Sequence, residues 1–259
     1  MTRASLLIAA ALPLMLAACA GSGAPPKPSK RQVAMIDRAL ARAPGAAQPS
    51  TIVAAEIAFA RDAQELGQWT AFAKYAAPGA LLHGRNGPFP IAPWLATQSN
   101  PPQAVTWKAR TVVMSCDGAV AVSQGRLREP DGTVGNFVTV WERQPDGEYR
   151  FVFDVGGADV PQPPPQPKVE EQPGDIVVTE IDAVQGLVAT CPRGDAPVPP
   201  PPAISLGEDG KTEARLSRDT TLRWRWEHRA DGTRYILAEY FYQGRWLTGI
   251  EQSLVPTGD

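Results

Sequence analysis

Clustered prolines constrain this chain more than any other feature of its sequence. The chain has 27 prolines in 259 residues, and they gather at positions 25–28, 161–167 and 197–202. Proline fixes φ and lacks an N–H donor, so such clusters support neither a helix interior nor a central strand. Each cluster is expected to be a stiff connector, although proline-rich segments also bind aromatic grooves. The remaining sequence therefore divides into residues 30–160 and residues 174–255.

The N-terminus has the pattern of a bacterial lipoprotein signal peptide. Arg3 is followed by an apolar run over residues 6–16, which is too short to span a bilayer because spanning takes ~20 apolar residues. The run ends at Leu16-Ala17-Ala18-Cys19, which resembles the lipobox, where a thiol is acylated and the chain is cut before it. This interpretation predicts a signal peptide over residues 1–18 and a lipid such as palmitate on Cys19. An ordinary secretory peptide is the alternative.

The net charge after cleavage and the residue that follows Cys19 indicate the partners and the location of the protein. Cleavage removes one cation, Arg3, from 25, so 24 cationic residues face 27 acidic ones and the balance is −3. A nucleic-acid partner would require a basic face, so we expect none. The expected partner is a membrane, held through Cys19. Ala20 is not the Asp that commonly retains lipoproteins in the inner membrane, so resemblance to Gram-negative lipoproteins favours the outer membrane, facing the periplasm. A homodimer is left open.

Two cysteines remain after the lipidated one, Cys116 and Cys191. An exported pair in an oxidising compartment can form a disulfide. Two free thiols are the alternative, since sequence does not give the distance between them.

The first block changes its hydrophobic period along the chain. Ser29 and Ser50 are candidate N-caps of two helices, and the second of these helices is expected to reach Leu66. Residues 69–77 predict a further helix, which is expected to end at Pro78-Gly79. A short strand over 80–83 follows. Strand-like runs at 105–114, 119–127, 134–142 and 149–155 are separated by Asp-Gly turn signals. Helices before an antiparallel meander predict an α+β fold.

The second block is strand-like, with runs at 175–181, 220–228, 235–242 and 246–250. Alternation places Leu222, Trp224 and Trp226 on one face, and Arg223 and Arg225 on the opposite face, which we expect to be solvated. A nucleic-acid or glycan platform is the less favoured interpretation. This block either forms a meander of its own or extends the first sheet.

Several motifs of the first block resemble a known family. They are Glu56-Ile57-Ala58-Phe59-Ala60-Arg61, Gly67-Gln68-Trp69-Thr70-Ala71-Phe72, Ser115-Cys116-Asp117-Gly118, Phe137-Val138-Thr139-Val140-Trp141-Glu142-Arg143-Gln144, Asp146-Gly147 and Phe153-Asp154-Val155-Gly156. Over about residues 50–157 the chain resembles the SnoaL-like and ketosteroid-isomerase-like group of the nuclear transport factor 2-like superfamily. The resemblance implies helices packed in a curved antiparallel sheet, a cone-shaped, cystatin-like fold with an apolar cavity at its open end.

The expected organisation follows from these observations. It comprises a lipidated, proline-rich spacer with a short helix over 19–49, a cone domain over 50–160, a linker over 161–173 and a β-rich extension over 174–259. The fold hosts isomerases, cyclases, dehydratases and plain binding modules, so it does not by itself specify a function.

Candidate ligand-binding residues are Tyr75, His83, Trp94, Trp107 and Asp154. For each aromatic residue the alternative role is core packing. For His83 the alternative is a structural role. The sequence has no cluster of metal ligands at the usual spacing, no phosphate loop and no nucleophile elbow, so we expect neither metal nor cofactor. The leading hypothesis is a non-catalytic envelope module that binds a small apolar ligand or a protein. The alternative is a cofactor-free isomerase or hydrolase that uses His83 or Asp154.

Overall fold

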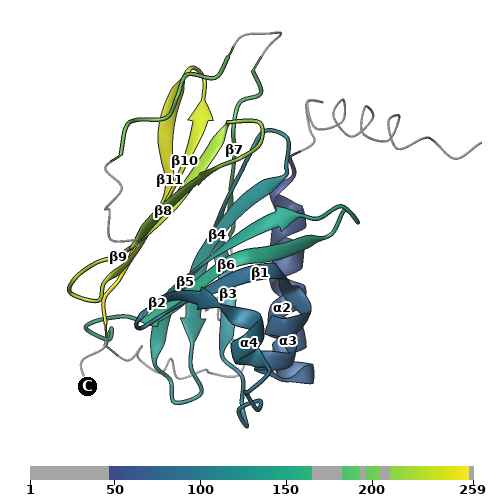
Figure 1. The fold of residues 1–259 in the computed structure, drawn as a ribbon. Coiled ribbons are helices and arrows are strands. Elements are labelled where there is room, and N and C mark those ends of the chain that lie inside the picture. Colours follow the sequence, from purple (N-terminus) through teal and green to yellow (C-terminus); the bar gives the residue numbers. More distant parts are fainter. Residues whose placement is uncertain (1–46, 165–182, 193–196, 205–210, 257–259) are drawn as a thin grey trace, which may run out of the picture.

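A computed structural model describes residues 47–164, 183–192, 197–204 and 211–256 (Figure 1). The lipobox with Cys19, the helix expected after Ser29 and the strand expected at 175–181 lie outside these residues. Within them, no helix has both the length and the apolar character needed to cross a bilayer.

The described residues form three layers (Figure 1). A seven-stranded sheet lies in the middle, helices cover one of its faces, and a four-stranded sheet covers the other. The elements are α2 (Pro49–Leu66), α3 (Gln68–Tyr75), β1 (Ala76–Gly84), β2 (Gly87–Pro90), α4 (Ile91–Leu95), β3 (Thr106–Met114), β4 (Val120–Arg128), β5 (Val134–Arg143), β6 (Tyr149–Ala158), β7 (Gln185–Val188), β8 (Thr212–Leu216), β9 (Leu222–His228), β10 (Arg234–Tyr242) and β11 (Arg245–Leu254).

The predicted fold class was wrong. The described part of the chain is mostly β, with strands in the order β2-β1-β6-β5-β4-β3-β7 and β11-β10-β9-β8. The larger sheet is mixed, not purely antiparallel, because β1 runs parallel to β6 and β7 runs parallel to β3. Two features caused the error. Strands β7 and β8 were not predicted, and the C-terminal strands build a second sheet, which was one of the two alternatives left open for this block.

The larger sheet has no solvated face in its centre, because its strands alternate between two cores. On β5, Val138 and Val140 point toward the smaller sheet, while Thr139 and Trp141 point toward the helices. Phe153 on β6 and Trp226 on β9 meet between the sheets with ring centroids 6.4 Å apart. Burial on both faces explains why apolar side chains occupy both sets of alternating positions on β5, such as Val138 and Val140 on one face and Phe137 and Trp141 on the other.

The helix boundaries differ slightly from prediction. Helix α2 starts at Pro49 and not after Ser50, because proline is well suited to the first helical position. Gly67, with φ of 100°, separates α2 from α3 as expected. Helix α3 ends at Tyr75, and Pro78 lies inside β1 at an irregularity between Ala76 and Leu81, where proline is tolerated.

Two turns with the same internal bonding join the sheets at one end. In each, a serine hydroxyl donates to an aspartate two residues later, at 2.6 Å in both Ser115–Asp117 and Ser217–Asp219. The Asp117 N–H donates to the Asp219 carboxylate at 2.9 Å. A disulfide between Cys116 and Cys191 lies beside this contact, with Cα atoms 5.1 Å apart, so the predicted pairing of these cysteines is confirmed.

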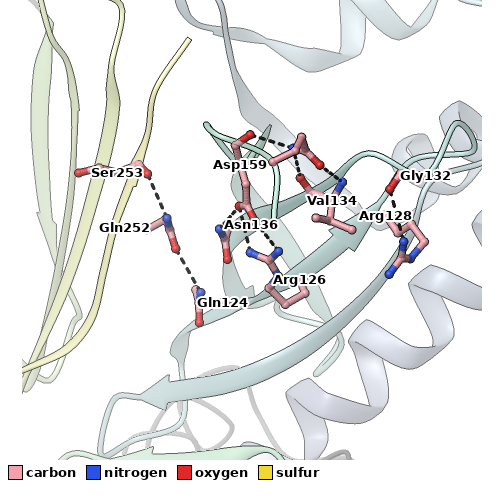
Figure 2. A network of polar contacts seen from close by, with 10 residues as sticks. Gln124, Arg126, Arg128, Gly132, Val134, Asn136, Asp159, Gln252 and Ser253 are labelled. Atoms are coloured by element: carbon pink, nitrogen blue, oxygen red, sulfur yellow. Dashed lines mark hydrogen bonds and ion pairs between the residues drawn. The ribbon is translucent and has the colours of Figure 1, made fainter. Parts of the chain in front are cut away.

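Polar contacts also fix β11 and the end of β6 (Figure 2). Gln124 on β4 donates to Gln252 on β11 at 3.2 Å, which links the two sheets. Arg126 makes a two-pronged ion pair with Asp159, and Asn136 donates to the same carboxylate at 2.8 Å. These contacts hold the segment after β6 against β4 and β5.

The arginines on the outward face of the smaller sheet were expected to be solvated, but Arg223 is buried. Leu222, Trp224 and Trp226 do face the first sheet. Arg223 on the opposite face is only 6% exposed and pairs with Glu239. A buried arginine on this face requires a segment of chain that covers it.

Candidate functional site

A cavity of about 210 Å³ lies between the helices and the larger sheet. Its lining includes Trp69, Phe72, Trp107, Thr139 and Asp154, and we call it the Asp154 cavity. A broader groove of about 800 Å³ follows α3 and α4, but it is lined mainly by exposed or half-buried residues of those helices. The Asp154 cavity is the better candidate because apolar walls there surround a few converging polar groups.

Aromatic rings form one wall of the cavity. Phe59 on α2 packs edge-to-face against Phe72 and Trp107, with both ring-centroid distances at 4.9 Å. These rings come from three different elements, α2, α3 and β3. Edge-to-face contacts of this kind fix ring orientation, so the wall is largely preformed.

A buried carboxyl group lies behind this wall. Glu56 on α2 is 2% exposed, and it accepts hydrogen bonds from Trp107 Nε1 at 3.0 Å and Trp141 Nε1 at 3.1 Å. The Ser123 hydroxyl donates to it at 2.5 Å. Burial raises the pKa of Glu56, while the three donors act in the opposite direction. The group therefore orients Trp107 at the cavity wall.

Asp154 is the buried carboxyl group that lines the cavity. The Thr139 hydroxyl donates to its carboxyl at 2.7 Å. Burial raises the pKa of Asp154 to about 7, and the charge of Glu56 adds to the rise while the Thr139 bond opposes it. A carboxyl with this pKa is partly protonated near neutral pH, so it can donate or accept a hydrogen bond or exchange a proton.

The structure brings two of the five predicted ligand residues to the cavity, Trp107 and Asp154. Trp94 lies behind Trp69, with ring centroids 4.8 Å apart. Tyr75 stacks on Phe59 at 4.8 Å and donates its hydroxyl to Asp62 at 3.0 Å. Trp94 and Tyr75 thus support the wall from behind.

His83 lies on the other side of the larger sheet. It neighbours Leu82, which lines the cavity, and side chains alternate along a strand. The His83 ring packs between the sheets against Trp226, with centroids 5.4 Å apart, and its Nε2 lies 3.1 Å from His228 Nδ1. Burial lowers the pKa of His83 to about 3, helped by His228 and Arg234. His83 and Asp154 therefore do not form an acid–base pair.

Sequence reasoning missed Glu56 and Thr139. The signal for Glu56 was present, because Ile52, Glu56, Phe59 and Ala63 have helical spacing and an acidic residue therefore falls on an apolar face. Thr139 gave no such signal, since threonine is common in strands.

Among the described residues, no group of three or more histidine, cysteine or acidic side chains is placed to hold a metal ion. Comparison with known proteins gives no matching family model and no matching curated protein.

Proposed function

We propose that this chain is a lipid-anchored envelope protein whose Asp154 cavity binds a small, mainly apolar molecule carrying one polar group. The observation that carries the proposal is the buried carboxyl of Asp154 in a largely aromatic cavity, whose other carboxyl, that of Glu129, is exposed. An engineered cavity of about 150 Å³ holds benzene, so about 210 Å³ suits a ligand built on one ring. The polar group of the ligand would pair with Asp154, because an unpaired polar group in an apolar site is costly.

The anchoring part of the proposal rests on the lipobox ending at Cys19 and on the signal-like sequence before it. It places the protein on the outer membrane, facing the periplasm. The resemblance of residues 50–157 to SnoaL-like proteins stays a prediction, and a homodimer stays open.

A cofactor-free acid–base enzyme is the second candidate. The observation that favours it is the pKa of about 7 at Asp154, since a general acid or base works best near ambient pH. Asp154 would be the buried acid–base group, because Glu56 is occupied by three donors and His83 faces the other sheet. Turnover of a bound ligand that stops in Asp154→Asn would favour this candidate.

Titration of the purified protein with p-cresol and toluene tests binding. The two molecules share a ring and a methyl group and differ by one hydroxyl. We expect both to shift the indole N–H signals of Trp69 and Trp107 in NMR spectra, with p-cresol binding more tightly. In Asp154→Leu the preference for p-cresol should disappear, since its hydroxyl loses its partner.

Trp246 gives a control signal within each spectrum, because its indole lies on the smaller sheet. Asp62→Asn is a matched control variant, as this carboxylate bonds Tyr75 and Lys74 outside the cavity. If neither probe shifts the Trp69 and Trp107 signals, or if Asp154→Leu keeps the p-cresol preference, the proposed ligand class is wrong.

A further inference from the structure

The smaller sheet buries its outward face as well as its inward one. Trp224 and Ala238 belong to the core between the sheets, so their strand neighbours Arg223 and Glu239 point the opposite way. Arg223 is 6% exposed and Glu239 is 9% exposed. Phe241, two residues after Glu239, is 8% exposed. A segment of chain must therefore cover this face.

Part of the cover is the third proline cluster. The Trp246 indole N–H donates to the carbonyl oxygen of Pro199 at 2.9 Å. Arg223 donates from Nη1 to the carbonyl oxygen of Pro202 at 2.6 Å. The guanidinium is itself held in place by Glu239, with Nε and Oε2 2.8 Å apart. The sheet therefore contacts the proline segment through backbone carbonyls three residues apart.

The spacing of these contacts has a physical meaning. Consecutive prolines favour the polyproline II helix, which has three residues per turn and no internal hydrogen bonds. Carbonyls of Pro199 and Pro202 are then one turn apart, on the same side of such a helix. The Trp246 indole and the Arg223 guanidinium can therefore both donate to the same side of a polyproline II helix. In a chain without the three-residue repeat, these two carbonyls would not lie on one side.

We propose that the outward face made by Arg223, Glu239, Phe241 and Trp246 is a recognition surface for proline-rich segments, which the chain's own residues 197–202 occupy and a proline-rich segment of another protein can occupy instead. The donors bind backbone carbonyls and not side chains. The surface therefore selects for the polyproline II conformation, and apolar contact comes from the ring of Trp246, which lies 6.2 Å from that of Phe241.

The tethered segment has an advantage over any free one. It belongs to the same chain, and short connections give effective concentrations in the millimolar range. A free peptide should therefore bind the native protein weakly. Binding should increase when the tethered segment is made less rigid, because a flexible segment loses more entropy when it docks.

The test uses the full chain and a labelled peptide of the sequence Pro-Val-Pro-Pro-Pro-Pro-Ala, which repeats residues 197–203. In the double variant Pro199→Gly/Pro202→Gly both carbonyl groups remain but the rigidity is lost. We expect this variant to bind the peptide at least about tenfold more tightly than the native chain, measured by fluorescence anisotropy. A peptide with glycine at the two matching positions should bind less tightly than the original.

Trp246→Phe in the same background keeps an aromatic ring and removes the N–H donor. It should weaken peptide binding about fivefold, the value of one hydrogen bond. A thermal melt of each variant checks that the fold is intact, and Trp94→Phe in that background, on the far side of the larger sheet, should leave peptide affinity unchanged. If loosening the tethered segment fails to increase binding, or if Trp246→Phe binds as well as its parent, the surface is only a structural contact.

Discussion

Thr139 and Asp154 are direct cross-strand partners on β5 and β6, and the Thr139 hydroxyl donates to the Asp154 carboxyl at 2.7 Å. Both side chains face the cavity and not the second sheet. Thr139 supplies one hydrogen bond to a buried carboxyl group, which is less than an ionised carboxylate requires. The protonated form of Asp154 is therefore favoured until the pH approaches about 7.

The first prediction concerns stability against pH in Asp154→Asn. The folded protein holds the Asp154 proton up to a pKa of about 7, whereas the ordinary value is 3.8. Between these values the folded state binds more protons, so the contribution of Asp154 to stability is full below about pH 4 and is lost as the pH rises toward about 7. The native chain should therefore lose up to about 4 kcal/mol relative to Asp154→Asn over this window.

Urea unfolding of the native chain and of Asp154→Asn across this pH range measures the difference in their unfolding free energies. His83 has the opposite dependence, because its pKa is lowered to about 3, but it is present in both proteins and cancels in the difference. A difference in unfolding free energy that stays constant with pH would show that Asp154 ionises normally.

The second prediction separates His83 from the cavity. His83 is 1% exposed and packs against Trp226 and Phe153 between the sheets. His83→Ala should leave a void there and destabilise the protein by roughly 2–4 kcal/mol, as large-to-small core substitutions do. Its affinity for p-cresol should be unchanged at temperatures where it is folded. Weaker p-cresol binding without a lower melting temperature would contradict the structural position of His83.

The third prediction concerns the strained turn before β9. Thr220 has φ of 61°, a conformation that a β-branched residue rarely adopts, and its side chain is exposed. The equivalent position in the turn before β4 is Gly118, with φ of 64°. Thr220→Gly should therefore stabilise the chain by about 1 kcal/mol, seen as a higher midpoint of urea unfolding. As a control for a general effect of glycine, Thr212→Gly at a half-buried position in β8 is expected to destabilise the chain.

The fourth prediction concerns the disulfide. Cys116 and Cys191 close a loop with a sequence separation of 75. Cys116→Ser/Cys191→Ser should lower the free energy of unfolding by about 4 kcal/mol in the chain-entropy model. The native protein under reducing conditions should show a similar loss, which controls for the effect of the serines. Equal stability of oxidised and reduced native protein would argue against this contribution.

The fifth prediction addresses the anchor. Cys19→Ser removes the thiol that the lipobox would acylate, so the substituted protein should leave the membrane fraction while its thermal melt is unchanged. Ser22→Ala, three residues further on, should stay membrane-bound. Membrane association of Cys19→Ser after a salt wash would refute the lipid assignment.

Local sequence signals predicted single elements well and the architecture poorly. Strands β3 to β6 and the Asp-Gly turns between them were found because alternation and turn residues are local properties. The parallel pairs of β1 with β6 and β3 with β7 were missed, since nothing near Ala76 or Gln185 in the sequence indicates its distant partner. Long-range pairing is decided by packing, which a single sequence does not display.

The candidate site shows the same limit. Trp107 and Asp154 line the cavity, whereas His83, chosen as a histidine on the short strand expected at 80–83, does not. A shift of one residue along a strand exchanges one face for the other, so Leu82 lines the cavity and His83 does not. Glu56 could have been found from its place on an apolar helix face.

Contacts at the two ends of β9 hold the two sheets together, and they determine how the sheets can separate. The disulfide and the Asp117–Asp219 contact both lie where β9 begins, whereas the His83–His228 contact lies where β9 ends. The disulfide joins the β3–β4 turn to the segment after β7, which are both parts of the larger sheet, so the cross-links between the two sheets are noncovalent at both ends. Either end of β9 can therefore part from the larger sheet without the breaking of a covalent cross-link.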